Sequence, residues 1–168
     1  VRTHRISTLV GRMESLHTDA SRRHVPPFPD PDAVRSLRRI VAEEHPDVIH
    51  AHDWMVHSLP PFSRGVRPAL VLSLHDYSLL CADKRMYRGD AVCPGPSLAA
   101  CVACAGERYG RVKGLVTAVG LRPSTAVVRR RVDLMLPVSS AVARLSGLAP
   151  GTRPFDVVPN FVPDALVT

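Results

Sequence analysis

Apolar and polar residues repeat with a helical period early in the chain. Between residues 34 and 41, apolar side chains recur at spacings of three, three and one, which places them on one face of a helix. Asp30 and Pro31 are typical of a helix start, because aspartate caps free N–H groups and proline fits the first turn. Pro46 disfavours helical backbone just before it, so we predict a helix from Pro31 to near His45.

Four short apolar runs have the length of β-strands. Their bounds are Val48–Ala51, Ala69–Leu74, Asp133–Val138 and Phe155–Val158. The second run is apolar at almost every position, which is typical of a strand covered on both faces in a parallel sheet. The sequence therefore predicts four buried strands.

Helical patterns lie between these runs. One continues through Trp54 to Leu59 and ends at a pair of prolines. A second covers Leu115–Val132, where Pro123 predicts an interruption, so this stretch is one or two helices. A third begins at a serine cap, Ser139 or Ser140, and closes at Gly147. Strands that alternate with helices predict an α/β fold with a doubly wound parallel sheet.

Residues 77–110 do not follow this alternation and are rich in Cys, Gly and Pro. We predict an inserted loop here, since long loops in compact domains are usually functional or separately tethered. The loop holds all four cysteines of the chain: Cys81, Cys93, Cys101 and Cys104. The last two are in C-x2-C spacing, so four thiolates could bind one structural zinc ion. Two disulfides or four free thiols are the alternatives.

Histidine and aspartate follow two neighbouring strands. His50, His52 and Asp53 end the first strand, and His75 and Asp76 end the second. Alternation along a strand places His50 and His52 on the same side. Ligands of open α/β sheets bind at the carboxyl ends of strands, and histidine suits proton transfer or metal binding. Each histidine could instead only hydrogen-bond the backbone at a strand end.

Two aromatic residues flank these strand ends. Trp54 and Tyr77 could stack on a sugar ring, although packing at a strand end explains them equally well.

The 168-residue chain has 22 basic and 15 acidic residues, and its formal net charge is +7. A solvated basic surface explains this charge, and attraction to anionic lipid, nucleotide or nucleic acid is the sharper alternative.

No apolar run has the length of a membrane span, and no secretory signal is visible, so we expect a cytoplasmic protein. The chain begins at Val1 rather than Met, so we expect a piece of a longer protein.

Several segments together resemble family 4 glycosyltransferases. Residues 46–54, PDVIHAHDW, are similar to a PDVVHAHDW stretch of that family, and residues 72–77, LSLHDY, are similar to its strand that ends in His-Asp-Tyr. Val138-Ser139-Ser140 resembles the turn before a late helix. Residues 158–162, VPNFV, resemble an I-P-N-G-V segment, with Phe161 in place of the usual Gly. The cysteine loop is similar to one found in a subset of the family.

The resemblance implies the GT-B architecture, in which two Rossmann-like domains face a cleft. Residues 1–164 would be a partial acceptor-side domain, and residues 165–168 the start of a linker to a donor-binding domain. The family transfers a sugar, with retention, from a nucleotide-sugar donor and needs no metal for the chemistry. We expect a glycan, lipid-linked or small-molecule acceptor, contact with the inner face of a membrane, and no activity of the chain alone.

The resemblance also implies roles for the strand-end residues. His75 would lie near the reaction centre, as the catalytic candidate. The substrate-binding candidates are His50, His52, Asp53, Trp54, Asp76 and Tyr77. A zinc-stapled module that binds nucleic acid or protein is the alternative function, but the basic residues are scattered and aromatic residues are few, so we expect no nucleic-acid partner. A receiver-type domain ranks third, because this sequence lacks the cluster of acidic residues at strand ends that would bind Mg²⁺ in such a domain.

Overall fold

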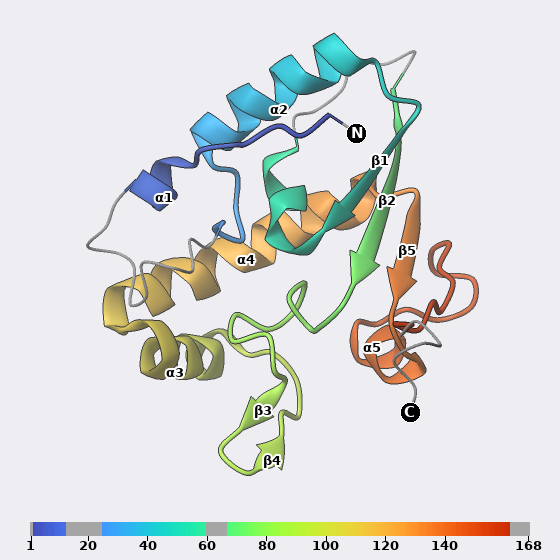
Figure 1. The fold of residues 1–168 in the computed structure, drawn as a ribbon. Coiled ribbons are helices and arrows are strands. Elements are labelled where there is room, and N and C mark those ends of the chain that lie inside the picture. Colours follow the sequence, from blue (N-terminus) through green and yellow to red (C-terminus); the bar gives the residue numbers. More distant parts are fainter. Residues whose placement is uncertain (1, 13–24, 60–66, 162–168) are drawn as a thin grey trace, which may run out of the picture.

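The computed structural model describes residues 2–12, 25–59 and 67–161. Its centre is a parallel sheet of three strands in the order β1 (Val48–His52), β2 (Ala69–Leu74) and β5 (Leu134–Pro137) (Figure 1). The register pairs Val48 with Ala69 and Val71 with Leu134. The α/β prediction with a parallel sheet is confirmed. The doubly wound, Rossmann-like arrangement stays a prediction, and residues 165–168 lie outside the described part of the chain.

The predicted strand at Phe155–Val158 forms only an isolated bridge. Met135 in β5 pairs with Phe155 in parallel orientation. Two further backbone hydrogen bonds, from Asp156 N to Met135 O and from Val158 N to Pro137 O, keep the segment beside β5. The segment therefore extends the edge of the sheet without becoming a regular strand.

Helix α2 (Pro31–Glu44) has the bounds that its caps predict. The Asp30 side chain accepts hydrogen bonds from the backbone N–H groups of Asp32 and Ala33, both at 3.1 Å. At the other end, His45 adopts the left-handed conformation with φ 45°, and Pro46 follows. Asp30 N also donates to the buried Ser58 Oγ at 3.0 Å, which ties the start of α2 to the 3-10 helix η2 (Asp53–Ser58).

The core lies around β2. Leu70, Leu72 and Leu74 are almost fully buried and pack with Met135 of β5 and Val128. Burying one such side chain contributes roughly 1.5 to 3 kcal/mol. Ser73, on the opposite face of the strand, is buried as well, so β2 is covered on both faces, as its apolar run predicts.

Helix α4 (Arg111–Arg131) is continuous, so the interruption predicted at Pro123 is wrong. A proline inside a helix removes one backbone hydrogen bond. Side chains next to the proline anchor α4 instead. Ser124 Oγ lies 2.7 Å from Nδ1 of His57 in η2, and Thr125 Oγ1 donates to the backbone oxygen of Leu79 at 2.9 Å. Tertiary contacts thus favour a helix that continues through a residue that propensity alone disfavours.

The short helix α5 (Ser140–Leu145) follows β5 as the sequence predicts. Ser139 is its N-cap, and the Ser139 Oγ accepts a hydrogen bond from Val142 N at 3.2 Å. After the helix, Gly147 has φ 69°, a backbone conformation that favours glycine.

Residues 77–110 are more ordered than the loop that the composition predicts. They contain the hairpin of β3 (Tyr87–Arg88) and β4 (Ala91–Val92), and then helix α3 (Leu98–Tyr109), which Ser97 caps (Figure 1). The buried carboxylate of Asp83 lies between the guanidinium groups of Arg85 and Arg108, at 2.6 and 2.9 Å. This pair of ion contacts fixes the turn before the hairpin to α3.

Helices α3 and α4 touch through backbone at Gly114. A Cβ added at this position would lie 2.6 Å from the carbonyl oxygen of Ala105 in α3. Only glycine permits so close an approach without a shift of one helix. No helix in the described ranges is long and apolar enough to cross a membrane.

Candidate functional site

The two strand ends that carry histidine lie side by side. In the sheet register His52 pairs with Ser73, and His75 comes directly after β2. His52 Nδ1 and His75 Nε2 are 2.9 Å apart, and their rings are stacked with an angle of 17° between planes. The ring centroids of His50 and His52 are 4.3 Å apart. The structure therefore brings His50, His52 and His75 into one exposed cluster, which we call the histidine cluster.

The hydrogen bond between His52 and His75 restricts their protonation. One of the two bonded nitrogens must be without a proton to accept the other's N–H, so both rings cannot be imidazolium at once. Partial burial lowers the pKa of His52, and nearby His50 and His75 lower it further. The lowered pKa favours the neutral form of His52, which can accept a hydrogen bond through one ring nitrogen and donate one through the other.

The third member of the cluster is fixed by a serine that the sequence pattern did not single out. His50 Nε2 lies 2.8 Å from the Oγ of Ser73, which is buried on the neighbouring strand. In the sequence, Ser73 stands out only as the one polar residue of an apolar strand, and its contact with His50 depends on the register of β1 and β2. Because Ser73 occupies Nε2 of His50, we expect His52 and His75 to be the members of the cluster that contact a ligand.

Asp53 and Trp54 belong to a separate arrangement beside the cluster. Asp53 has φ 54°, and its Oδ1 accepts hydrogen bonds from Trp54 N at 2.7 Å and from Lys84 Nζ at 2.6 Å. The Lys84 ammonium also lies 4.0 Å from the centre of the Trp54 ring. Trp54 is buried, and its indole N–H donates to Ser78 O at 2.9 Å. Stacking of Trp54 on a sugar ring thus stays a prediction.

Asp76 and Tyr77 shape the turn after His75. Asp76 Oδ1 accepts a hydrogen bond from Ser78 N at 2.8 Å, which closes an Asx-type turn. Tyr77 is half-buried and packs against the main core. Both residues therefore hold the turn that positions His75, and their contact with a substrate stays a prediction.

A fourth histidine near the site has a different environment. His57 is buried in η2, and burial lowers its pKa to about 4 although the charge of Asp53 acts in the opposite direction. Its ring joins η2 to Ser124 of α4. His57 therefore stays neutral near pH 7 and is a structural residue.

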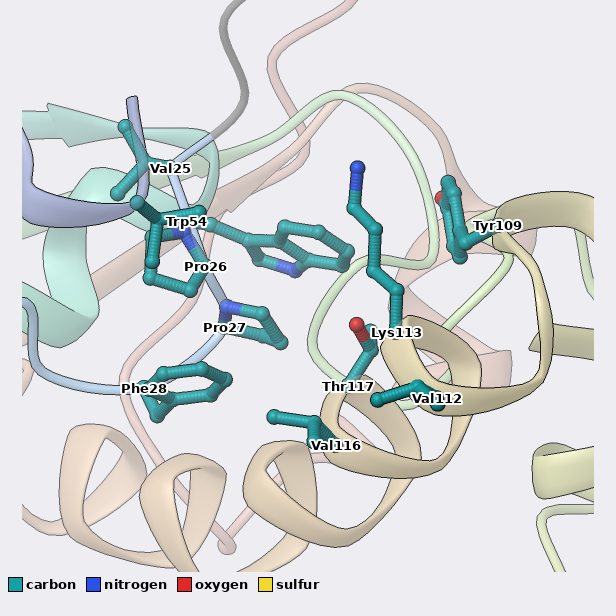
Figure 2. Close-up of a pocket in the computed structure, with 11 residues that line it drawn as sticks. Val25, Pro26, Pro27, Phe28, Trp54, Tyr109, Val112, Lys113, Val116 and Thr117 are labelled. Carbon is teal, nitrogen blue, oxygen red and sulfur yellow. The ribbon is translucent and has the colours of Figure 1, made fainter. Parts of the chain in front are cut away.

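The structure also has a cavity that the sequence did not predict. Figure 2 shows this cavity of about 220 Å³ between Trp54, the start of α4 and the segment Val25–Phe28. Its walls are almost entirely apolar, and Lys113 extends between Trp54 and Tyr109 at one side (Figure 2). Val10 also lines the cavity, so four parts of the sequence form its walls and no local pattern could have indicated it.

Cys81 lies in the turn before the hairpin, Cys93 follows β4, and Cys101 and Cys104 lie on α3. Burial raises the pKa of the Cys101 thiol, and the nearby Cys81, Cys93 and Cys104 raise it further. All four side chains are half-buried free thiols. Within the described ranges, no three His, Cys, Asp or Glu side chains are arranged to hold a metal ion. A closed zinc site would require the thiols to move together, so zinc stays a prediction.

Metal analysis tests this prediction. Four thiolates around one tetrahedral ion should give about one zinc per chain in protein purified without chelator. The double variant Cys101→Ser/Cys104→Ser should lose that zinc. A folded, metal-free wild-type protein with four reactive thiols would contradict the prediction.

Comparisons with known proteins do not identify the chain. No protein-family model, no curated protein and no solved structure matches it. The chain is therefore not assigned to a family by likeness to a known protein.

Proposed function

We propose that this chain is the acceptor-binding half of a retaining glycosyltransferase with the GT-B architecture. The observation that carries the proposal is the contact of 2.9 Å between His52 and His75. Both residues stand in the segments that resemble family 4 glycosyltransferases, HAHDW and LHDY. They end neighbouring parallel strands, where ligands of open α/β sheets bind.

In this proposal His75 orients the acceptor hydroxyl or hydrogen-bonds the sugar in transfer. A neutral imidazole donates through one nitrogen and accepts through the other, so His75 can hold a hydroxyl while it remains paired with His52. His50 and His52 form the wall of the acceptor site, and Asp53 fixes the backbone turn beside it. The nucleotide-sugar donor binds mainly to a second domain, and the reaction takes place on the cytoplasmic side, at or near a membrane.

The alternative is a zinc-stapled module that binds nucleic acid or protein. The formal net charge of +7 and the four cysteines within residues 81–104 favour this reading. The aromatic stacking surfaces that single-stranded nucleic acid requires are few, because Trp54 is buried and Tyr109 is half-buried. We therefore rank this alternative second.

NMR of the histidine side chains in the 168-residue chain tests the proposal. Titration with a panel of mono- and oligosaccharides should shift the imidazole C–H resonances of His52 and His75. The resonances of His4 and His57 serve as internal controls, since His4 contacts Glu44 at 2.8 Å and His57 is buried. Shifts at the histidine cluster alone support an acceptor site. Unchanged cluster resonances with every sugar, together with shifts caused by oligonucleotides, would overturn it.

A further inference from the structure

Helix α4 has an unusual distribution of side chains. A surface helix normally buries its apolar face and exposes its polar face. On α4, five large aliphatic side chains are exposed, whereas the buried side chains are mostly small or polar. The exposed set is Val112, Leu115, Val116, Val119 and Val127. The buried set is Gly114, Thr117, Ala118, Leu121, Ser124, Thr125 and Val128.

The exposed aliphatic side chains form a continuous stripe. Positions 112, 115, 116 and 119 have the spacing of one helix face, and their side chains are 75%, 48%, 49% and 48% exposed. We call this set the α4 stripe. On one side, Val112 and Val116 continue into the apolar cavity described above. The α4 stripe is thus an apolar surface that is exposed to solvent and continuous with the cavity.

All of the net positive charge lies in the same part of the chain. Residues 77–131 hold ten Lys and Arg residues against three acidic ones, and the other 113 residues hold twelve of each. Helix α4 itself contains six basic residues and no acidic one. The exposed Arg111 and Arg122 lie along one border of the α4 stripe. Figure 1 shows α3 and the β3–β4 hairpin at the same end of the molecule.

We propose that the α4 stripe and its arginines dock on the surface of an anionic lipid membrane. A helix with an aliphatic face and basic borders lies in the plane of the lipid headgroups, with the aliphatic side chains inserted and the arginines on the phosphates. A second copy of the chain fits this surface poorly, because docking would bring two strongly basic segments together. Nucleic acid fits poorly as well, because the stripe is aliphatic and offers bases no aromatic surface to stack on.

Vesicle co-sedimentation of the intact chain tests this proposal. Vesicles of equal parts phosphatidylglycerol and phosphatidylcholine should bind the protein, and vesicles of phosphatidylcholine alone should bind it far less. Raising the salt concentration should weaken binding to the anionic vesicles, since salt screens the arginine–phosphate attraction.

Two sets of variants separate the apolar and the charged contributions. Val112→Asn/Val119→Asn should weaken vesicle binding about tenfold or more, because two aliphatic side chains no longer enter the lipid. Arg111→Gln/Arg122→Gln should weaken binding and make it less dependent on salt. The matched control is Val48→Asn, since Val48 is 55% exposed at the start of β1 and outside the stripe.

The outcomes decide the proposal. Loss of binding in the stripe variants, with normal binding of the Val48 variant and unchanged thermal unfolding of all, supports it. Equal binding to both vesicle types, or equal binding of stripe and control variants, overturns it. A stripe variant that changes the oligomeric state while the wild type ignores vesicles would assign the surface to a second copy and also overturn it.

Discussion

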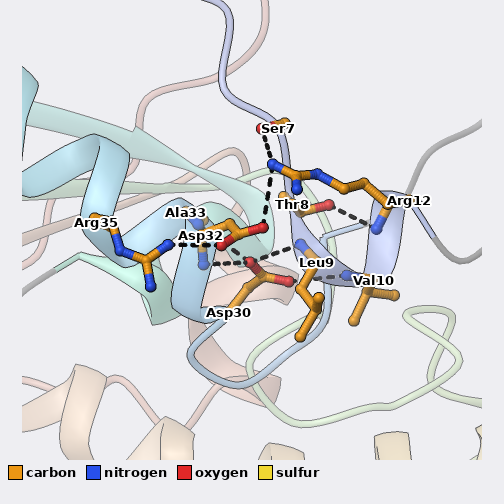
Figure 3. A network of polar contacts seen from close by, with 10 residues as sticks. Ser7, Thr8, Leu9, Val10, Arg12, Asp30, Asp32, Ala33 and Arg35 are labelled. Carbon is orange, nitrogen blue, oxygen red and sulfur yellow. Dashed lines mark hydrogen bonds and ion pairs between the residues drawn. The ribbon is translucent and has the colours of Figure 1, made fainter.

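Asp30→Ala is expected to lower the free energy of unfolding by about 3 to 4 kcal/mol, because one buried carboxylate accepts four backbone hydrogen bonds. Figure 3 shows the arrangement. Two donors, Asp32 N and Ala33 N, start helix α2. The other two, Leu9 N at 3.0 Å and Val10 N at 3.1 Å, start helix α1 (Leu9–Arg12) about twenty residues earlier in the chain. Alanine would leave donors of both helices without their acceptor.

Asp30 is only 1% exposed, so water cannot replace the carboxylate without rearrangement. Chemical denaturation of wild type and variant measures the effect. Asp30→Asn keeps one acceptor oxygen and should cost less than alanine. Asp156→Ala removes an exposed aspartate and should be nearly neutral. A loss below about 1 kcal/mol for Asp30→Ala, which is the size of an ordinary helix cap, would show that the contacts from α1 contribute little.

The same carboxylate gives stability a defined dependence on pH. Burial alone would raise the pKa of Asp30, but the four N–H donors outweigh it and hold the pKa below its usual range. The unfolded chain therefore takes up this proton at a higher pH than the folded chain does. The contribution is complete above the ordinary aspartate pKa and disappears as the pH falls through the lowered value. In Asp30→Ala, this part of the acid destabilisation should be missing.

For the glycosyltransferase proposed above, His75→Ala is expected to lower turnover about a hundredfold or more. This is the usual size of the effect of a positioned acid–base or hydrogen-bonding side chain. The fold should survive, because His75 is exposed and its side chain hydrogen-bonds His52, which is exposed as well. The measurement is kcat and KM for transfer, with thermal unfolding of each variant.

The matched control for His75 is His4→Ala. His4 lies far from the cluster in the sequence, and its ring contacts Glu44, the last residue of α2, at 2.8 Å. His75→Gln keeps one hydrogen-bonding group and should recover part of the rate. If His75→Ala turned over at nearly the wild-type rate, the residue would have no part in the reaction.

The elements that local chemistry determines were predictable from the sequence. Asp30, Pro31 and Pro46 mark the ends of α2, and the apolar run Ala69–Leu74 matches β2 residue for residue. The alternation of side chains along β1 also placed His50 and His52 together, as the ring contact confirms. These features depend on a few neighbouring residues, which is why a single sequence is sufficient for them.

Features set by distant contacts were not predictable. Pro123 predicts a break, but the next two residues anchor α4 to distant segments: Ser124 contacts His57, and Thr125 donates to the backbone oxygen of Leu79. The composition of residues 77–110 predicts a loop, but Asp83 clamps the segment to α3 through Arg108. The partner of His75 required the register between β1 and β2, which no local pattern contains.

The contact at Gly114 links the cysteines to a position that carries no side chain. Because α3 rests against the backbone of α4 there, no side chain separates the two helices at this point. Cys101 and Cys104 are carried on α3, so a shift of α3 away from a larger residue at position 114 would move both thiols together. The positions of these two thiols thus depend on a residue of the neighbouring helix that has no side chain of its own.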